Sequence, residues 1–257
     1  MIALVTGASS GIGKDISIEL AKKGYDIIAV ARNEERLMKL KNDIENNYKV
    51  NCIYKIVELD NRQSCFKLYE DVKNEFDNID ILINNAGFGL CGKFLETELD
   101  KEINMIDTNI TSLHILTKLF VKDMVEQDRG YIMNVASIAG FMAGPLMATY
   151  YSTKNYVVRL SQALRYELKA QKSNVKISCL CPGPVDTNFN KVANVKFSLK
   201  GANSADVAKY AVNKMFKNRF FILPGIGIKC TRFFAKIIPD NIMSRFCYIM
   251  QSKKIDE

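Results

Sequence analysis

Short apolar runs alternate with longer amphipathic stretches along most of the chain. The apolar runs are rich in β-branched residues, which is typical of strands buried on both faces of a sheet. They predict strands at residues 2–6, 26–30, 52–59, 79–83, 130–136, 175–181 and 220–223. The amphipathic stretches predict helices at residues 11–23, 34–46, 62–76, 99–127, 150–170 and 205–217. We therefore expect one doubly wound α/β domain, in which a seven-stranded parallel sheet with right-handed crossovers carries helices on both faces.

Three segments between these elements show neither periodicity: residues 87–95, 138–146 and 182–203. The first two follow predicted strands. In open parallel sheets ligands bind beyond the carboxyl ends of the strands, so these two segments are candidate walls of a binding site. Residues 186–203 within the third segment are predicted to form a lid that closes over a substrate.

A glycine-rich turn, residues 6–13, joins the first predicted strand to the first predicted helix. Glycines let the backbone turn sharply and let a pyrophosphate approach the helix N-terminus, where unpaired N–H groups and the helix dipole attract anions. The spacing is Gly-x-x-x-Gly-x-Gly rather than the commoner Gly-x-Gly-x-x-Gly. Its place between strand and helix predicts nucleotide binding through Gly7, Ser9, Ser10, Gly11, Ile12 and Gly13.

Arg32 follows the second predicted strand, where an acidic residue would select NAD by bonding a ribose 2′-hydroxyl. An arginine can instead hold a 2′-phosphate through two hydrogen bonds, which favours NADP(H). The alternative is an ordinary solvated arginine paired with Glu34 or Glu35.

Polar residues also follow the third and fourth predicted strands, where the adenine edge and the middle of a dinucleotide would lie. Small side chains in the second group allow close approach of the backbone. We expect cofactor contacts from Asp60, Asn61, Asn85, Ala86 and Gly87.

Tyr150 and Lys154 stand one helical turn apart, so the phenol and the ammonium share a helix face. A nearby cation lowers the pKa of a tyrosine from its ordinary value of about 10, which makes the phenol a usable acid and base. The spacing alone also fits a surface pair. Tyr151 is adjacent but lies about 100° away around the helix, so the role is assigned to Tyr150.

Two further polar residues complete the pattern. Ser137 ends the fifth predicted strand, and Asn109 lies inside a predicted helix, where a buried polar role would explain a mediocre helix former. In the order and spacing of these residues the chain resembles the short-chain dehydrogenase/reductase family from residue 2 to residue 187. The positions that carry the resemblance are Thr6 to Gly13, Asn84 to Gly87, Asn109, Ser137, Tyr150, Lys154 and Pro182-Gly183. The resemblance implies a nicotinamide-dependent oxidoreductase with a single Rossmann-type domain.

The resemblance also implies a role for each matching residue. Tyr150 donates a proton to a carbonyl oxygen or takes it from an alcohol, and Lys154 lowers the Tyr150 pKa and holds the nicotinamide ribose. Ser137 bonds the substrate oxygen, and Asn109 anchors a water that links Lys154 to solvent. Arg32 without a preceding acid resembles the NADP-using members. Further cofactor contacts are implied for Pro182, Gly183, Val185 and Thr187.

Composition narrows the class of protein. The formal net charge is +8, but basic residues are scattered among acidic ones, so a nucleic-acid partner is not expected. Seven cysteines at irregular positions and a single histidine fit unpaired thiols in a reducing cytoplasm and argue against a metal site. We expect neither a secretory signal nor a transmembrane segment, because no leader-like run and no long apolar run is present.

The C-terminal segment differs from the rest. We expect a catalytic and dinucleotide-binding domain over residues 1–225 and a basic amphipathic extension of it over residues 226–257. Such an extension is compatible with peripheral contact with a membrane, with packing on the domain, with covering the substrate cleft, or with a subunit interface.

These features together predict an NADP(H)-dependent enzyme that interconverts a ketone and a secondary alcohol, with an apolar substrate. A 3-oxoacyl thioester, a steroid and a general carbonyl compound all remain open, because fold analogy does not choose a substrate. The alternative is a non-catalytic NADP(H)-binding sensor or scaffold. The resemblance further implies a homodimer or homotetramer that pairs through the two long predicted helices, residues 99–127 and 150–170.

Overall fold

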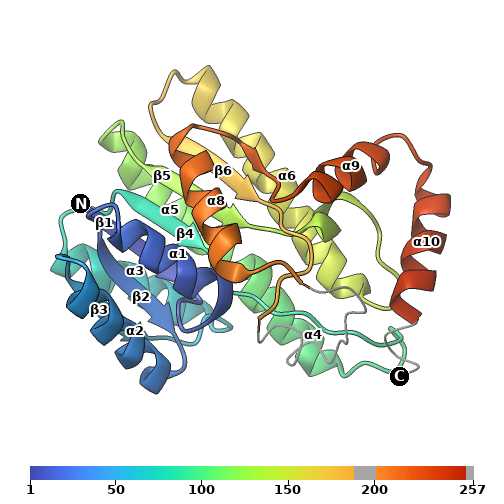
Figure 1. Cartoon of the computed structure of the whole chain (residues 1–257), viewed down its shortest axis with the longest axis horizontal. Helices are drawn as coiled ribbons and strands as arrows, with labels where there is room; N and C mark the ends of the chain where they lie inside the picture. Colours follow the sequence, from blue (N-terminus) through green and yellow to red (C-terminus); the bar gives the residue numbers. More distant parts are fainter. Residues whose placement is uncertain (188–200, 253–257) are drawn as a thin grey trace.

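The computed structural model describes residues 1–187 and 201–252. Within these residues one parallel sheet has seven strands in the order β3-β2-β1-β4-β5-β6-β7 (Figure 1). The strands are β1 (Ile2–Thr6), β2 (Asp26–Ala31), β3 (Cys52–Ile56), β4 (Ile81–Asn84), β5 (Tyr131–Val135), β6 (Lys176–Leu180) and β7 (Phe221–Ile222). The predicted α/β fold with a seven-stranded parallel sheet is confirmed. The order reverses between β1 and β4, and ligands bind at such a point in doubly wound sheets.

Helices cover both faces of the sheet (Figure 1). One hydrophobic cluster joins the first face to α1 (Gly11–Ala21), α2 (Glu34–Asn47) and α8 (Ser204–Phe216). A second cluster joins the other face to α3 (Arg62–Glu75), α5 (Ser112–Glu126) and α6 (Ala148–Ala170). Val5 belongs to the first cluster and its neighbour Leu4 to the second. Successive strand side chains point to opposite faces, so an uninterrupted apolar run fills both layers.

The long helix expected over residues 99–127 is interrupted. Its parts are α4 (Leu99–Ile106), a π-helical segment (Asp107–Thr111) and α5. The buried Asn109 lies within the π-helical segment. A π-helical turn widens the helix and is frequent at functional sites. The apolar pattern on both sides of the break is continuous, so the sequence periodicity does not reveal it.

Several predicted boundaries also shift. The strand expected to reach residue 59 ends at Ile56, because Leu59 is buried against α3 in the core instead of continuing the ladder. The helix expected from residue 150 begins at Ala148. A short 3₁₀ helix (Ile138–Phe141) follows β5. Residues 188–200 of the predicted lid and residues 253–257 of the predicted extension lie outside the described residues.

The C-terminal segment forms two helices, α9 (Ile226–Phe234) and α10 (Asp240–Ser252), at one end of the molecule (Figure 1). Pro239 separates them, because proline has no N–H to continue a helix. Its carbonyl accepts the first bonds of α10, from Ile242 N at 3.0 Å and Met243 N at 3.1 Å. Among the described residues, no helix has the length and apolar character needed to cross a bilayer.

Candidate active site

The glycine-rich turn between β1 and α1 is held in shape by the end of β4. Gly7 and Gly11 have φ angles of +65° and +54°, which favour glycine. Asn85 Nδ2 donates to the carbonyls of Thr6 and Gly7 at 3.0 and 3.2 Å. A Cβ on Gly13 would lie 2.3 Å from Asn85 Nδ2 and 2.4 Å from the Gly7 oxygen. The positive φ angles explain why glycine is needed at Gly7 and Gly11, and the close approaches explain why it is needed at Gly13.

The N-terminus of α1 opens onto this turn. Ser10 is the N-cap, but its side chain makes no capping hydrogen bond within the described chain, and the first turn carries no acidic residue. The leading N–H groups and the positive end of the helix dipole therefore remain available to an anion. This geometry fits a dinucleotide pyrophosphate.

The residues predicted near the adenosine half lie at the ends of neighbouring strands. Arg32 is exposed directly after β2. Asn61 caps α3, since its Oδ1 accepts from Gln63 N at 2.8 Å. The Asp60 carboxylate accepts from Asn104 Nδ2 of α4 at 2.7 Å, which ties this loop to the start of the interrupted helix.

Tyr150 and Lys154 are both buried in the first turns of α6. Lys154 Nζ lies 5.9 Å from the centre of the Tyr150 ring and donates to the Val135 carbonyl at 3.1 Å. Ser137 follows β5, and its side chain hydrogen-bonds that of Tyr150. Its hydroxyl also accepts from Ala139 N at 3.2 Å, which fixes the serine at the start of the 3₁₀ helix. The structure thus brings together the three residues that the sequence separates.

Burial dominates the electrostatics of this group. It raises the pKa of Tyr150 to about 12, against which the Ser137 hydrogen bond acts. It lowers the pKa of Lys154 to about 8, because the charged ammonium loses solvation. The expectation that the Tyr150 pKa lies below its ordinary value is therefore not met: desolvation raises this pKa, and the Lys154 ammonium bonds the Val135 carbonyl.

Asn109 ties the loop after β4 to α6. Its Oδ1 accepts from Phe88 N at 3.0 Å, and its Nδ2 donates to the Phe88 carbonyl at 2.9 Å and to Thr153 Oγ1 at 3.0 Å. A Cβ on Gly87 would lie 2.7 Å from Asn109 Oδ1 and 3.4 Å from Lys154 Nζ. The side chain of Asn109 thus holds the loop directly beside Lys154. The water that it is expected to anchor stays a prediction.

The segment after β6 lies between the turn and the C-terminal helices. The Pro182 carbonyl accepts from Ile138 N at 2.9 Å, and Val185 is buried. Thr187 lies against the glycine-rich turn, since a Cβ on Gly11 would be 2.9 Å from Thr187 Cγ2. Two of the four cofactor contacts expected in this segment, Pro182 and Thr187, therefore border the loop that follows β5 and the turn, respectively.

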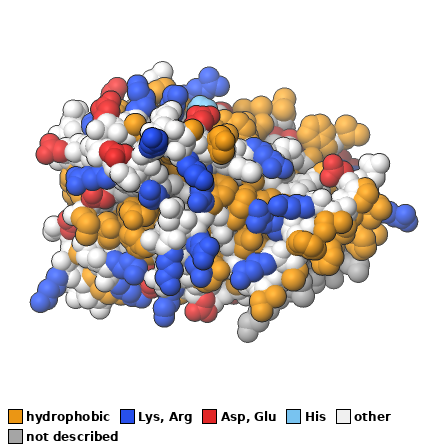
Figure 2. All heavy atoms as spheres, turned by 90° about the horizontal axis from the view of Figure 1, so that it is seen from above, with side chains coloured by type: hydrophobic (Ala, Val, Ile, Leu, Met, Phe, Trp, Pro, Cys, Tyr) orange, Lys and Arg blue, Asp and Glu red, His pale blue; other side chains and the backbone are white. Residues whose placement is uncertain are grey.

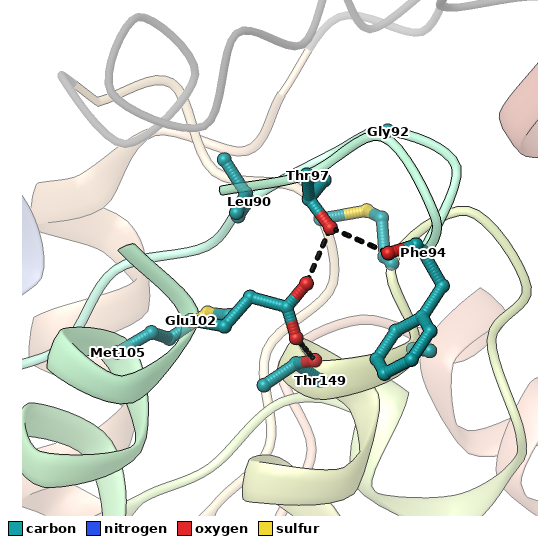
Figure 3. A pocket seen from close by; sticks show the side chains of 9 residues that line it. Leu90, Gly92, Phe94, Thr97, Glu102, Met105 and Thr149 are labelled. Atoms are coloured by element: carbon teal, nitrogen blue, oxygen red, sulfur yellow. Dashed lines mark hydrogen bonds between the residues drawn. The ribbon is translucent and has the colours of Figure 1, made fainter. Parts of the chain in front are cut away.

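Glu102 is a buried residue of α4 that the sequence analysis does not identify. Its carboxylate accepts from Thr97 Oγ1 and from Thr149 Oγ1, the residue before Tyr150 (Figure 3). It lies in the wall of a small cavity with Leu90 and Met105. One carboxylate thus joins the β4–α4 loop to the first turn of the helix that carries Tyr150. Glutamates are common on exposed helix faces, so the sequence alone gives no signal of this role.

Replacement of Glu102 by alanine is expected to lower the free energy of unfolding by about 2–4 kcal/mol, because two hydroxyls lose a charged acceptor. Glu98→Ala is the matched control, since Glu98 is exposed and its ion pair with Lys101 lies at the surface. Its expected cost is below about 0.5 kcal/mol. Urea denaturation measures both. Equal costs for the two variants would show that the Glu102 bridge does not stabilise the chain.

Tyr151 joins the site to the C-terminal helices. Its hydroxyl accepts from Gln251 Nε2 of α10 at 2.8 Å, and its ring packs edge-on against that of Tyr150, with centroids 6.1 Å apart. Gln251 is buried. The sequence leaves open whether the C-terminal segment packs on the domain, and the contact between Gln251 and Tyr151 holds one end of the segment beside the catalytic candidates.

Comparison with known proteins shows the family to which this chain belongs. Residues 1–196 match the family model described as short chain dehydrogenase. The chain belongs to the short-chain dehydrogenase/reductase family. An uncharacterized oxidoreductase of Staphylococcus saprophyticus is 34% identical over 215 residues, which cover 83% of this chain and 91% of the relative. The similarity therefore covers nearly the full length of this relative.

Solved structures of other short-chain dehydrogenases superpose closely. One from Sphingobium yanoikuyae in complex with NADPH has a TM-score of 0.84 and 25% identity, with 95% of each chain covered. One from Burkholderia phymatum in complex with NAD has a TM-score of 0.83 and 23% identity, with 91% of this chain and 92% of that chain covered. The latter shows the fold alone. The family prediction is confirmed, and the individual site roles stay predictions.

Proposed function

We propose that the protein is an NADP(H)-dependent oxidoreductase that interconverts a ketone and a secondary alcohol, with Tyr150 as the acid and base. Membership of the short-chain dehydrogenase/reductase family makes the chain an oxidoreductase. The observation that carries the finer proposal is the hydrogen bond between Ser137 and the buried Tyr150, together with the buried Lys154, whose Nζ lies 5.9 Å from the centre of the Tyr150 ring. A proton donor and a cation held together at the carboxyl edge of the sheet suit carbonyl reduction.

The residues present fit a dinucleotide. The uncapped N-terminus of α1 and the turn at Gly7, Gly11 and Gly13 would hold the pyrophosphate. Arg32 would hold a 2′-phosphate and Lys154 the nicotinamide ribose. Further contacts are proposed for Ser9, Ser10, Ile12, Asp60, Asn61, Asn85, Ala86, Gly87, Pro182, Gly183, Val185 and Thr187. When bound, the nicotinamide supplies the hydride, and the protein supplies position and electrostatics.

The chain's own part in the reaction is proton transfer and charge stabilisation. Tyr150 is protonated over the whole neutral range, because burial raises its pKa to about 12. It can therefore donate its phenolic proton to the substrate oxygen during reduction. Ser137 would hydrogen-bond the same oxygen, and the Lys154 ammonium, present below its pKa of about 8, would stabilise the negative charge left on Tyr150.

Two features support NADP(H) over NAD(H). Arg32 stands where an acid would otherwise select NAD, and it is exposed and thus able to meet a phosphate. Two solved structures with 25% identity carry NADP-type ligands: the short-chain dehydrogenase of Sphingobium yanoikuyae with NADPH, and an alcohol dehydrogenase from the archaeon Thermococcus sibiricus with 5-hydroxy-NADP, at TM-scores of 0.84 and 0.75.

Replacement of Arg32 by alanine is expected to raise KM for NADPH about ten- to a hundredfold, because a charged hydrogen bond to a phosphate is lost. KM for NADH serves as the internal control and is expected to change less than about threefold, since NADH has no 2′-phosphate. Steady-state kinetics with both cofactors measure the effect. An equal rise for both would place Arg32 outside the 2′-phosphate site.

The surroundings of Tyr150 favour an apolar substrate. Tyr150 packs with Met105, Ala139 and Met147, and the partly buried Phe88 and Leu90 lie against this cluster. Apolar walls would receive a hydrophobic group beside the reacting carbonyl. A panel of 3-oxoacyl thioesters, steroid ketones and small diketones, followed by NADPH oxidation, tests the proposal. Turnover of only small polar ketones would contradict the apolar pocket.

We also propose pairing of two copies through α4, α5 and α6. Ile103 of α4 and Tyr166 of α6 are exposed large hydrophobic residues on these helices, which supports a contact there. Light scattering of the purified chain gives the oligomeric state.

A further inference from the structure

The two C-terminal helices and their junction expose an unusual amount of hydrophobic surface. Nine large side chains between residues 226 and 252 are 47–79% exposed: Ile226, Phe233, Phe234, Ile237, Ile242, Phe246, Tyr248, Ile249 and Met250. We call these nine residues the C-terminal apolar surface. Hydrophobic side chains gather at the same end of the molecule in Figure 2. Scattered single hydrophobic residues are ordinary, whereas a continuous group marks an interaction site.

The inner sides of these helices are attached to the domain, so the exposure is not due to detachment. The Arg232 guanidinium lies 3.7 Å from the centre of the Phe221 ring and 5.2 Å from that of Phe141. Ile228 contacts the segment after β6, because a Cβ on Gly183 would lie 2.3 Å from Ile228 Cδ1. Gln251 bonds Tyr151. The C-terminal apolar surface is therefore the outward side of α9 and α10, whose inward side packs on the domain.

The charges on the outward side are nearly all positive. Lys229, Lys236 and Arg245 are exposed, whereas Asp240 is the single acidic residue between positions 226 and 252. Basic side chains lie beside the hydrophobic ones at this end of the molecule in Figure 2. Asp240 is in the first turn of α10, where it complements the helix dipole.

We infer that the C-terminal apolar surface docks on an anionic lipid bilayer. Aromatic and aliphatic side chains flanked by Lys and Arg are the signature of helices that lie in the membrane interface. A second copy of the chain fits less well. In a twofold contact the same surface meets itself, so Lys229, Lys236 and Arg245 would meet a surface that carries one acidic residue, Asp240.

The candidate active site lies directly behind this surface. The inward sides of α9 and α10 touch Gly183 and Tyr151, so about one helix diameter, roughly 10 Å, separates the docked surface from these residues. A docked chain would therefore hold its proposed apolar pocket next to the acyl region of the bilayer. The docking inference itself does not depend on turnover and is tested without it.

The test is co-sedimentation of the purified full chain with vesicles of phosphatidylglycerol and phosphatidylcholine in equal parts, and with phosphatidylcholine alone. We expect binding to the anionic vesicles at low salt, weakened by high salt because ionic screening reduces the attraction. The double variant Phe233→Glu/Phe246→Glu is expected to lower the partition coefficient more than about tenfold. Lys229→Glu/Lys236→Glu keeps the apolar residues and is expected to lower it by a similar factor.

Phe66→Glu is the matched control, since Phe66 is 41% exposed on α3. This helix packs on the sheet far from α9 and α10 (Figure 1). Its partition is expected to equal that of the wild type. Circular dichroism verifies that each variant is folded. Absence of vesicle binding by the wild type at low salt overturns the inference. If the wild type does not bind vesicles and the Phe233→Glu/Phe246→Glu variant forms a smaller oligomer than the wild type, the surface is a contact between copies of the chain.

Discussion

Replacement of Tyr150 by phenylalanine is expected to lower kcat/KM for NADPH-dependent ketone reduction by about 10²–10⁴-fold, because the variant has no proton to give to the substrate oxygen. The ring and its packing with Met147 and Ala139 remain, so the fold and NADPH affinity are expected to persist. Initial rates of NADPH oxidation and a fluorescence titration with NADPH measure the two quantities separately.

Tyr156→Phe is the matched control, because it removes a hydroxyl from the same helix where the group bonds His114 instead of Ser137. Its kcat/KM is expected to stay within about threefold of the wild type. Tyr151→Phe decides between the two adjacent tyrosines. A large loss in Tyr151→Phe with full activity in Tyr150→Phe would reverse the assignment of the acid.

Replacement of Lys154 by methionine is expected to lower kcat for ketone reduction by about 10²–10³-fold, since a buried cation beside the reacting group is lost. Lys169→Met is the control, because Lys169 is an exposed residue in the last turn of the same helix. Equal rates for wild type and Lys154→Met would show that the ammonium takes no part in turnover.

The same lysine sets an expected pH dependence. Because kcat/KM for NADPH reports groups of the enzyme before NADPH binds, the Lys154 pKa of about 8 applies to that parameter. Below that pH the lysine is an ammonium and kcat/KM for reduction is expected to be level. Above it the amine is neutral and kcat/KM is expected to fall. Tyr150, with its pKa at about 12, adds no change in the neutral range. Residual activity of Lys154→Met should lack the decline near pH 8.

The fold was predictable because its signals are local. Each strand of the sheet is a short apolar run, and the turn at Gly7, Gly11 and Gly13 needs glycine for reasons that the structure makes explicit. The grouping of Tyr150 with Ser137 was implied by the family resemblance, and their places at a helix start and a strand end agree with it. These features depend on residues close in sequence or on general rules for parallel sheets.

Other features depend on long-range contacts that no local pattern carries. The π-helical segment contains Asn109, which bonds Phe88 and Thr153, far away in the sequence. Glu102 acquires its role only because Thr149 lies beside it in the folded chain. The effect on the Tyr150 pKa was predicted with the wrong sign, because spacing shows a neighbouring cation but not the burial of both groups.

The most direct test of the central claim is the mass of the alcohol formed from an apolar ketone with NADPH deuterated at the transferable position of the nicotinamide. We expect an alcohol that carries one deuterium at the former carbonyl carbon, formed by the wild type and formed far more slowly by Tyr150→Phe. Tight NADPH binding without any deuterated alcohol across the full substrate panel would contradict the account and favour a non-catalytic sensor or scaffold.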